Sequence, residues 1–224
     1  MAKYTISDIH GNYNLLLKMM KLINFSEEDI LYVIGDIIDR GPESLAVYEY
    51  IRRHKNIKMI KGNHEQLAED GLDTLDTYNW FGNGGQQTYY ELLTQNCIAY
   101  NYMDRFTEWC KSLPYYIIDG DKILVHAGIK IFEEATSVEE LMAMQTPKDM
   151  LWERNKNAQS ERFENYTVIC GHTRTAKIEA SSKGKIIKGD SVIYIDCGAN
   201  SYGTLGCLNL DTLEEYYVGR QYGE

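Results

Sequence analysis

Residues 30–41 read ILYVIGDIIDRG, an apolar run that ends at a glycine and is followed by two acidic residues and an arginine. The run at 30–34 is rich in β-branched and apolar side chains, which is typical of a buried strand. Further short strands are expected on either side at 4–6 and 57–60, and the segments between them, 13–23 and 43–53, have helical spacing of apolar residues. Strands that alternate with helices predict βαβ units and a mostly parallel sheet.

The rest of the chain predicts a helical segment followed by more strands. Residues 67–113 are mainly helical in pattern with a glycine-rich loop at 81–85, residues 115–125 form a hairpin that turns at Gly120-Asp121, and residues 138–152 are helical again. Short strands are expected at 166–170, 185–188, 191–196, 203–210 and 214–218. Because no repeat, linker or shift in composition interrupts the chain, we predict a single α/β domain over residues 1–224, with parallel units first and a largely antiparallel second sheet later.

Composition limits the class of protein. The 224 residues are 44% hydrophobic and 25% charged, which excludes extensive disorder, and the net charge of −10 argues against broad affinity for nucleic acid or anionic membranes. The five cysteines include no C-x-x-C pair, so neither a disulfide framework nor a thiolate zinc site is indicated. With no signal-like N-terminus and no long apolar run, a soluble cytoplasmic protein is expected.

Four of the five histidines lie in short polar motifs, each directly after an expected strand or just beyond it. The five motifs of this kind are Ser7-Asp8-Ile9-His10-Gly11, Gly35-Asp36-Ile37-Ile38-Asp39-Arg40-Gly41, Lys61-Gly62-Asn63-His64-Glu65, His126-Ala127-Gly128 and Gly171-His172-Thr173. Ligands of open α/β sheets bind beyond the carboxyl ends of the strands, so we expect the motifs to build one site. His54 lies in a basic helix end and is excluded from it.

The spacing within the motifs predicts two metal ions. Asp8 and His10 are two residues apart, so from an extended segment their side chains would point the same way and chelate one cation. Asp36 can bridge two cations, and the second would also be bound by Asn63, His126 and His172. A mixed nitrogen and oxygen set without thiolate suits manganese, iron or zinc better than magnesium or calcium.

The remaining polar residues of the motifs predict phosphoryl chemistry. His64 need not bind metal, and a histidine oriented by a carboxylate, here Asp39, is a good general acid beside a metal pair. Arg40 presents a forked cationic donor set that matches a phosphoryl group, and Arg154 is a second candidate clamp. Together these residues predict hydrolysis at phosphorus by metal-bound hydroxide.

The ordered motifs resemble the signature of the phosphoprotein phosphatase family of calcineurin-like metallophosphoesterases, especially its compact bacterial and phage members, over roughly residues 4 to 200. The resemblance implies a fold of two mixed β-sheets flanked by helices, with His64 and Asp39 protonating the leaving group. One metal would be held by Asp8, His10 and Asp36, the other by Asp36, Asn63, His126 and His172, and the expected substrate-binding residues are Arg40, Arg154 and Asn63.

Three functions are carried forward. The first is a manganese-dependent phosphatase of phosphoserine and phosphothreonine, with phosphotyrosine as an additional candidate, in which water between the metals attacks in line. The second is a symmetric diadenosine tetraphosphate hydrolase. The third is a non-catalytic metal-binding scaffold, which we disfavour because the acid and the bridging ligand are both present. The expected partner is a phosphorylated protein or a small phosphoester, and the sequence leaves the oligomeric state open.

Two further features of the sequence, a glycine-rich loop and two cysteines, have more than one interpretation. Asn83-Gly84-Gly85 either faces the phosphate or only breaks the helical segment. Cys170 and Cys197 stand near the expected site, but we interpret them as small buried hydrophobic residues.

Overall fold

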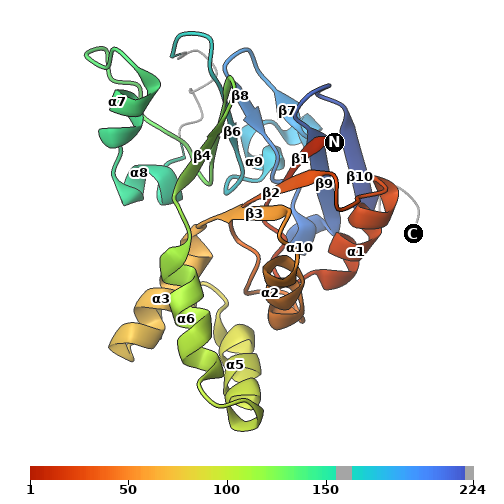
Figure 1. Cartoon of the computed structure of the whole chain (residues 1–224), viewed down its shortest axis with the longest axis vertical. Coiled ribbons are helices and arrows are strands. Elements are labelled where there is room, and N and C mark those ends of the chain that lie inside the picture. Colours follow the sequence, from red (N-terminus) through yellow and green to blue (C-terminus); the bar gives the residue numbers. More distant parts are fainter. Residues whose placement is uncertain (155–162, 220–224) are drawn as a thin grey trace.

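Two mixed sheets of five strands each pack against one another in the computed structural model, which describes residues 1–154 and 163–219 (Figure 1). The first sheet has the order β10-β9-β1-β2-β3 and consists of β1 (Lys3–Ile6), β2 (Ile30–Ile34), β3 (Ile57–Ile60), β9 (Thr204–Asn209) and β10 (Glu215–Gly219). The second has the order β4-β5-β6-β8-β7 and consists of β4 (Tyr116–Asp119), β5 (Lys122–Val125), β6 (Thr167–Cys170), β7 (Ile187–Lys188) and β8 (Val192–Tyr194). The α/β class and the pair of mixed sheets are confirmed.

Strand direction corrects one prediction. In the first sheet β1, β2 and β3 are parallel, and β9 and β10 continue it in antiparallel fashion. The second sheet is not largely antiparallel, because β5, β6 and β8 are parallel and only its edge strands β4 and β7 are antiparallel. The connections from β5 to β6 and from β6 to β8 contain helices, and such long crossovers permit parallel pairing. The sequence pattern of short strands could not predict whether they pair in parallel, because the crossover connections decide which strands become neighbours.

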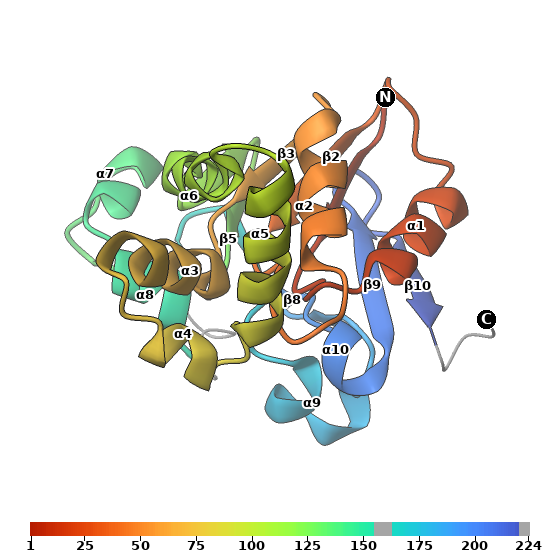
Figure 2. The same cartoon turned by 90° about the horizontal axis from the view of Figure 1, so that it is seen from below.

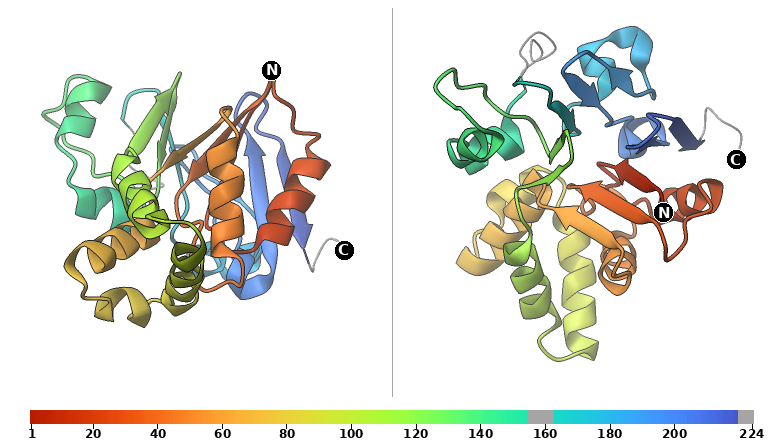
Figure 3. Two further views of the ribbon diagram at one scale, coloured as in Figure 1. Left: turned by 60° about the horizontal axis from the view of Figure 1, so that its bottom comes forward. Right: turned by 45° about the horizontal axis from the view of Figure 1, so that its top comes forward.

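Helices cover both outer faces and one end of the sheets (Figures 2 and 3). Helices α1 (Tyr13–Leu22) and α2 (Ser44–Arg53) lie on the side of the first sheet, and α7 (Val138–Ala143) and α8 (Pro147–Trp152) lie on the side of the second. The end segment is formed by α3 (Asn63–Thr74), α4 (Tyr78–Gly82), α5 (Gln86–Ile98) and α6 (Tyr102–Ser112), and two short helices, α9 (Thr175–Ile178) and α10 (Ala199–Tyr202), follow β6 and β8. In the part of the chain that the structure describes, no helix is long and apolar enough to span a membrane.

Two helical boundaries differ from the expectation. The helix expected over 138–152 is divided in two, because Pro147 starts a new helix whose first turn is capped by Thr146, which accepts a hydrogen bond from the backbone N–H of Asp149. Helix α3 starts at Asn63 rather than near residue 67. The third motif therefore forms the first turn of a helix, and this turn fixes the directions of Asn63 and His64.

The core has three layers. One cluster lies between the first sheet and its helices and contains Ile6, Val33, Trp80 and Phe106. A second joins the inner faces of the two sheets through Ile34 and Leu208 of the first and residues such as Leu124, Ile169 and Ile193 of the second. The third packs α7 and α8 on the outer face of the second sheet. The prediction that residues 1–224 form a single domain stays a prediction.

Candidate metal centre

The polar motifs meet where parallel strands of both sheets end. Asp8 and His10 follow β1, Asp36 follows β2 and Asn63 follows β3, while His126 and His172 follow β5 and β6 of the second sheet. Hydrogen bonds connect the two sets, because the backbone N–H of His172 donates to Asp8 Oδ2 (2.9 Å) and the His126 ring contacts the Ile34 carbonyl (2.9 Å). The structure thus brings together all six residues predicted to bind metal, from strands that are far apart in sequence.

The backbone at these positions is strained. Six non-glycine residues of the predicted site have left-handed backbone conformations, with φ between 47° and 70°: Asp8, His10, Asp36, Asp39, Arg40 and His172. Each such conformation is unfavourable for a residue with a side chain, and such strain is concentrated at functional sites. The expectation of an extended Asp8-x-His10 segment is therefore wrong. A left-handed turn, rather than the alternation of a strand, directs both side chains inward.

Asp36 is the centre of the site. Its Oδ2 lies 3.8 Å from His10 Nε2, 3.9 Å from His64 Nε2 and 3.4 Å from His126 Nε2. Its Oδ1 accepts a hydrogen bond from the backbone N–H of His64 (2.9 Å). The Asp36 side chain is 2% exposed, so the carboxylate faces imidazole nitrogens instead of water.

Two clusters of ligand atoms share Asp36. One contains His10, Asp36 and His64, the other contains Asp36, His126 and His172, and the atoms of each cluster lie within 4.8 Å of one another. Asn63 adds an oxygen to the second, because its Oδ1 lies 2.9 Å from both His126 Nε2 and His172 Nδ1. Asp8 lies beside the first cluster, with Oδ1 4.0 Å from His10 Nε2.

The protonation of the imidazoles follows from burial and from Asp36. Burial lowers the pKa of His10 and of His172 to about 3, so both rings are neutral at physiological pH, and each keeps one nitrogen electron pair that can accept a hydrogen bond or bind a cation. Burial also acts to lower the pKa of His126, but the carboxylate of Asp36 outweighs it and raises that pKa to about 10. In His10 and His126 the Nδ1 atoms contact the backbone carbonyls of Ile38 and Ile34, which leaves Nε2 facing the centre.

These residues fit a pair of divalent cations. Carboxylate, amide and imidazole groups converge on two adjacent points that share one carboxylate, and the ring orientation of two histidines is fixed by backbone carbonyls. The buried His64 Nε2 has no hydrogen-bond partner among the described residues, so a hydrogen-bond acceptor at this point would satisfy it. The donor set does not distinguish manganese from iron or zinc.

His64 is held by a buried network. Its Nδ1 contacts Asp39 Oδ2 (2.7 Å), and both side chains are inaccessible to solvent. Asp39 also accepts hydrogen bonds from Trp80 Nε1 at Oδ2 (2.8 Å) and from Thr88 Oγ1 at Oδ1 (2.7 Å). Burial opposes the charge of His64, but Asp36 and Asp39 outweigh it and raise the pKa of the ring. The predicted pairing of His64 with Asp39 is present in the geometry.

The two predicted arginines reach the same site. Arg40 Nη1 lies 2.6 Å from His10 Nε2, and Arg154 Nε donates to His172 Nε2 (3.2 Å). Both line a cavity of about 320 Å³ together with His10 and His172. The roles of these residues in binding substrate stay predictions.

Sequence reasoning missed three residues. Glu65 is fully buried and accepts hydrogen bonds from the backbone N–H groups of Asp36 (2.8 Å), Ile37 (3.0 Å) and Gly62 (2.9 Å). Its signal was its place at the end of the third motif. Arg174 and Asp196 line the 320 Å³ cavity. Arg174 directly follows the Gly-His-Thr motif, and Asp196 was assigned to a strand that in fact ends at Tyr194.

The structure shows the contacts of the features that the sequence left open, although whether the glycine-rich loop faces a phosphate stays a prediction. The loop at Asn83-Gly84-Gly85 contacts the second motif, because the Gly84 carbonyl accepts the backbone N–H of Arg40 (3.1 Å), and it also separates α4 from α5. Cys170 and Cys197 are buried and free, as expected, and burial raises the pKa of both thiols. His54 follows the last residue of α2, outside the site.

Comparison with known proteins agrees with this geometry. The family model described as calcineurin-like phosphoesterase matches residues 4–203. The chain belongs to this family. The chain is similar to the symmetrical bis(5'-nucleosyl)-tetraphosphatase of Buchnera aphidicola, to which it is 30% identical over 133 residues that make up 58% of this chain and 44% of that protein. Serine/threonine-protein phosphatase 2 of Salmonella typhimurium is 39% identical over 93 residues, 41% of each chain.

Solved structures agree with the calcineurin-like phosphoesterase fold. The cold-active protein-tyrosine phosphatase of a Shewanella species superposes with a TM-score of 0.63 at 18% identity, covering 97% of this chain and 79% of that one. At this identity the similarity concerns the fold alone. The matched region spans less than half the length of the curated relatives named above.

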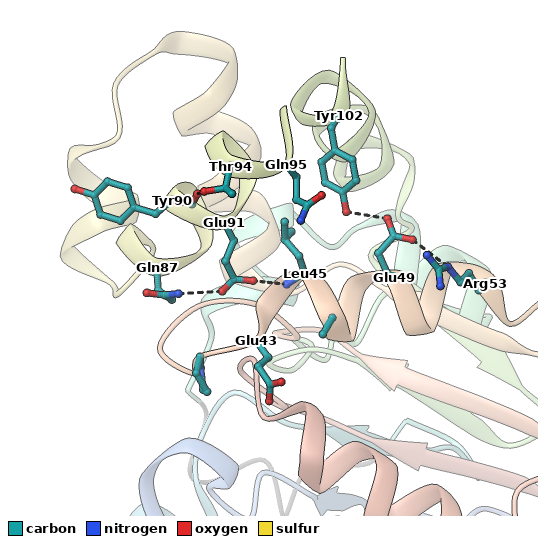
Figure 4. Close-up of a pocket in the computed structure, with 12 residues that line it drawn as sticks. Glu43, Leu45, Glu49, Arg53, Gln87, Tyr90, Glu91, Thr94, Gln95 and Tyr102 are labelled. Atoms are coloured by element: carbon teal, nitrogen blue, oxygen red, sulfur yellow. Dashed lines mark hydrogen bonds and ion pairs between the residues drawn. The ribbon is translucent and has the colours of Figure 1, made fainter. Parts of the chain in front are cut away.

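A larger cavity lies away from the motifs. It measures about 650 Å³ and lies between α2, α5 and the start of α6 (Figure 4). Figure 4 shows Glu91 of α5 bonded to the first turn of α2 at Leu45 N (2.9 Å) and Tyr102 bonded to Glu49 (2.8 Å). These contacts fasten the helical segment to α2, and the side chains that make them are not those of the metal centre.

Proposed function

We propose that this chain is a metal-dependent phosphoester hydrolase. The observation that carries the proposal is His64, a buried imidazole whose Nδ1 is bound to Asp39. Its Nε2 has no hydrogen-bond partner in the described part of the chain and lies 3.9 Å from the central carboxylate of Asp36. A histidine of this kind beside two clusters of metal ligands matches the needs of a general acid at a phosphoryl group.

The ligand sets expected from the sequence are retained in the proposal. Asp8, His10 and Asp36 would hold one divalent cation, and Asp36, Asn63, His126 and His172 the other, with manganese proposed and iron or zinc as alternatives. When bound, such cations polarise the phosphoryl group and lower the pKa of the attacking water.

The protein residues supply proton transfer and orientation. With Nδ1–H directed to Asp39, His64 carries its transferable proton on Nε2, where it can pass to the leaving oxygen. Arg40 and Arg154 would bind phosphoryl oxygens, since each already directs a guanidinium N–H at an imidazole of the site. Asn63 would help to orient the phosphoryl group from the first turn of α3.

Two candidate substrate classes are proposed. The first candidate is a phosphoserine or phosphothreonine ester, with phosphotyrosine in addition, and its support is the similarity to Salmonella serine/threonine-protein phosphatase 2. The second is a symmetric dinucleoside tetraphosphate, supported by the similarity to the Buchnera tetraphosphatase. The partner would accordingly be a phosphorylated protein or a small phosphoester in the cytoplasm.

Turnover by the purified protein tests the proposal. With manganese, the protein should release phosphate from phenyl phosphate, whose leaving group needs protonation, and His64→Asn should lower kcat by roughly 10²- to 10⁴-fold while metal content is unchanged. His54→Asn is the matched control, because His54 lies outside the site, and it should retain full turnover. Wild-type turnover in His64→Asn with metal still bound would refute the acid assignment.

A substrate panel separates the candidates. Comparing kcat/KM for a phosphoserine peptide and for diadenosine tetraphosphate decides between them, and a strong preference for the nucleotide would overturn the first candidate. Absence of hydrolysis across manganese, iron and zinc and all these substrates would instead favour a non-catalytic scaffold.

A further inference from the structure

The cavity at the metal centre extends beyond the residues that one phosphoryl group needs. Its volume is about 320 Å³, and its lining continues from His10, Arg40, Arg154 and His172 to Arg174 and the segment 196–201. We propose that Arg174 and this segment form a second phosphate subsite, which makes substrates with two adjacent phosphates the preferred class. The inference rests on the proposed function and narrows its substrate.

Arg174 is oriented by a neutral hydroxyl and an aromatic ring. Its Nη1 donates to Ser201 Oγ (2.6 Å), and its guanidinium lies 5.9 Å from the centre of the Tyr202 ring. Among the described residues it forms no ion pair with a carboxylate. A guanidinium has five N–H donors, so one hydrogen bond to a neutral hydroxyl leaves four for a ligand. The guanidinium of Arg174 is therefore oriented and charged and still has N–H donors to offer, as an anion site requires.

Segment 196–201, which contacts Arg174, packs closely against the Tyr202 ring. Gly198 has φ +80°, and a Cβ at this position would come within 2.5 Å of the Tyr202 ring. Glycine therefore lets the ring of Tyr202 lie against the backbone, below the guanidinium of Arg174. Ser201 and Asn200 are exposed, so the polar edge of the segment is open to solvent and to substrate.

The charge of the lining favours more than one phosphate. Among the described residues, the cavity is lined by the guanidinium groups of Arg40, Arg154 and Arg174 and by one carboxylate, that of Asp196. Asp196 already accepts the backbone N–H of Gly198 (2.9 Å), so part of its hydrogen-bonding capacity is used within the loop. In a chain with net charge −10, this local excess of positive charge is unusual.

Two arginines and the metal centre are sufficient for one phosphoryl group. A phosphoserine peptide presents a single phosphoryl group on a neutral alkyl oxygen and gives Arg174 no anion to bind. A polyphosphate ester places a second phosphate next to the one that is cleaved, where a further guanidinium would bind it through charge-assisted hydrogen bonds. The chemistry of Arg174 therefore matches a dinucleoside polyphosphate or an inorganic polyphosphate.

Arg174→Gln tests the subsite. The ratio of kcat/KM for diadenosine tetraphosphate to that for p-nitrophenyl phosphate should fall by about 10- to 150-fold, the effect of losing a charged hydrogen-bond partner. Arg105→Gln is the matched control, because Arg105 also lies over a tyrosine ring, that of Tyr102 at 5.6 Å, but outside the cavity, and it should leave the ratio unchanged. Ser201→Ala removes the hydroxyl that orients Arg174, so it should also lower this ratio, by a smaller factor. An unchanged ratio in Arg174→Gln overturns the proposal.

Binding separates the subsite from catalysis. By calorimetry, the wild-type protein should bind pyrophosphate more tightly than orthophosphate, and Arg174→Gln should remove most of this preference. If no ester is hydrolysed but the preference depends on Arg174, the subsite stands and the proposed function fails. If esters are hydrolysed but the preference survives in Arg174→Gln, the subsite is wrong. Comparing the affinities for diadenosine tetraphosphate and for inorganic tripolyphosphate shows which of these two sources of adjacent phosphates the subsite prefers.

Discussion

Glu65 holds the loop that carries Asp36, the carboxylate that faces three imidazoles. The Glu65 carboxyl group spans two strand ends, since Oε2 accepts the backbone N–H groups of Asp36 and Gly62, and Oε1 accepts that of Ile37. Burial, followed by the charge of Asp36, raises the pKa of Glu65 to about 7. A side chain at Gly62 would collide with both Asp36 and Glu65, so glycine is required for this close approach.

Glu65→Gln should weaken metal binding without removing a ligand. The amide keeps one acceptor but places an NH₂ group against backbone N–H donors, which misorients Asp36. Because outer groups of this kind typically contribute 10- to 100-fold to metal affinity, we expect a loss of this order for manganese, measured by competition with a chelating dye. Glu108→Gln, a change on the surface of α6, should bind manganese normally. Unchanged affinity in Glu65→Gln would contradict this role.

The segment from α4 to α5 positions Asp39 and His64, the proposed acid pair, from outside the sheets. Trp80 of α4 and Thr88 of α5 donate to the two oxygens of Asp39, and Thr88 Oγ1 also accepts the backbone N–H of Asp39 (3.0 Å). A Cβ at Gly85 would overlap the indole of Trp80, so the glycine between the helices allows this arrangement. Glu91 fastens the same helix α5 to α2 (Figure 4). An insertion of helices is thereby part of the site.

Thr88→Val should impair catalysis and stability together. Valine has a similar shape but neither donates to Asp39 Oδ1 nor accepts from its backbone, so buried polar groups lose partners at a cost of about 1 to 3 kcal/mol in the free energy of unfolding. We expect a lower urea midpoint and reduced turnover, with a larger reduction for phenyl phosphate than for p-nitrophenyl phosphate, whose leaving group needs less protonation. Thr94→Val, at an exposed position of the same helix, is the control. Equal losses for the two substrates would argue against an effect on the acid pair.

Helix α8 is tied to the loop after His126 by Asp149, which accepts hydrogen bonds from Lys130 Nζ (2.5 Å) and from Thr146. Burial acts to raise its pKa, but these bonds outweigh it and lower the pKa from 3.8 to about 2. The stabilisation is therefore complete above the unfolded value and is lost as the pH falls from about 4 to 2. Asp149→Asn should lower the free energy of unfolding by about 1 to 2 kcal/mol at pH 7, and its difference from wild type should shrink below pH 4. A difference independent of pH, followed by urea unfolding, would refute this.

At the scale of the whole molecule, the metal centre joins the two sheets. Asp8, Asp36 and Asn63 follow strands of the first sheet, and His126 and His172 follow strands of the second. The apolar contacts between the inner faces bring these strand ends to a common edge. A cation bound by both sets would therefore resist separation of the sheets as well as activate substrate.

Manganese should raise the melting temperature of the protein, and a chelator should reverse the rise. A ligand at 100 times its Kd stabilises the folded state by about 2.7 kcal/mol, which is several degrees in Tm for a chain of this size. His172→Ala should reduce the rise because it removes a ligand from the second sheet, whereas His54→Ala should not. An equal rise in all three proteins would place the bound metal elsewhere.

The sequence by itself determined the α/β class, the first three strands and the membership of the motif residues in one site. Apolar runs specify buried strands, and polar residues placed directly after parallel strands must gather at one edge. Tertiary structure alone decided the strand directions of the second sheet, the left-handed turns at Asp8, His10 and Asp36, and the positions of Glu65, Trp80 and Arg174 at the site. These depend on which distant groups meet once the chain has folded, and a local pattern carries no information about a partner on another strand or helix.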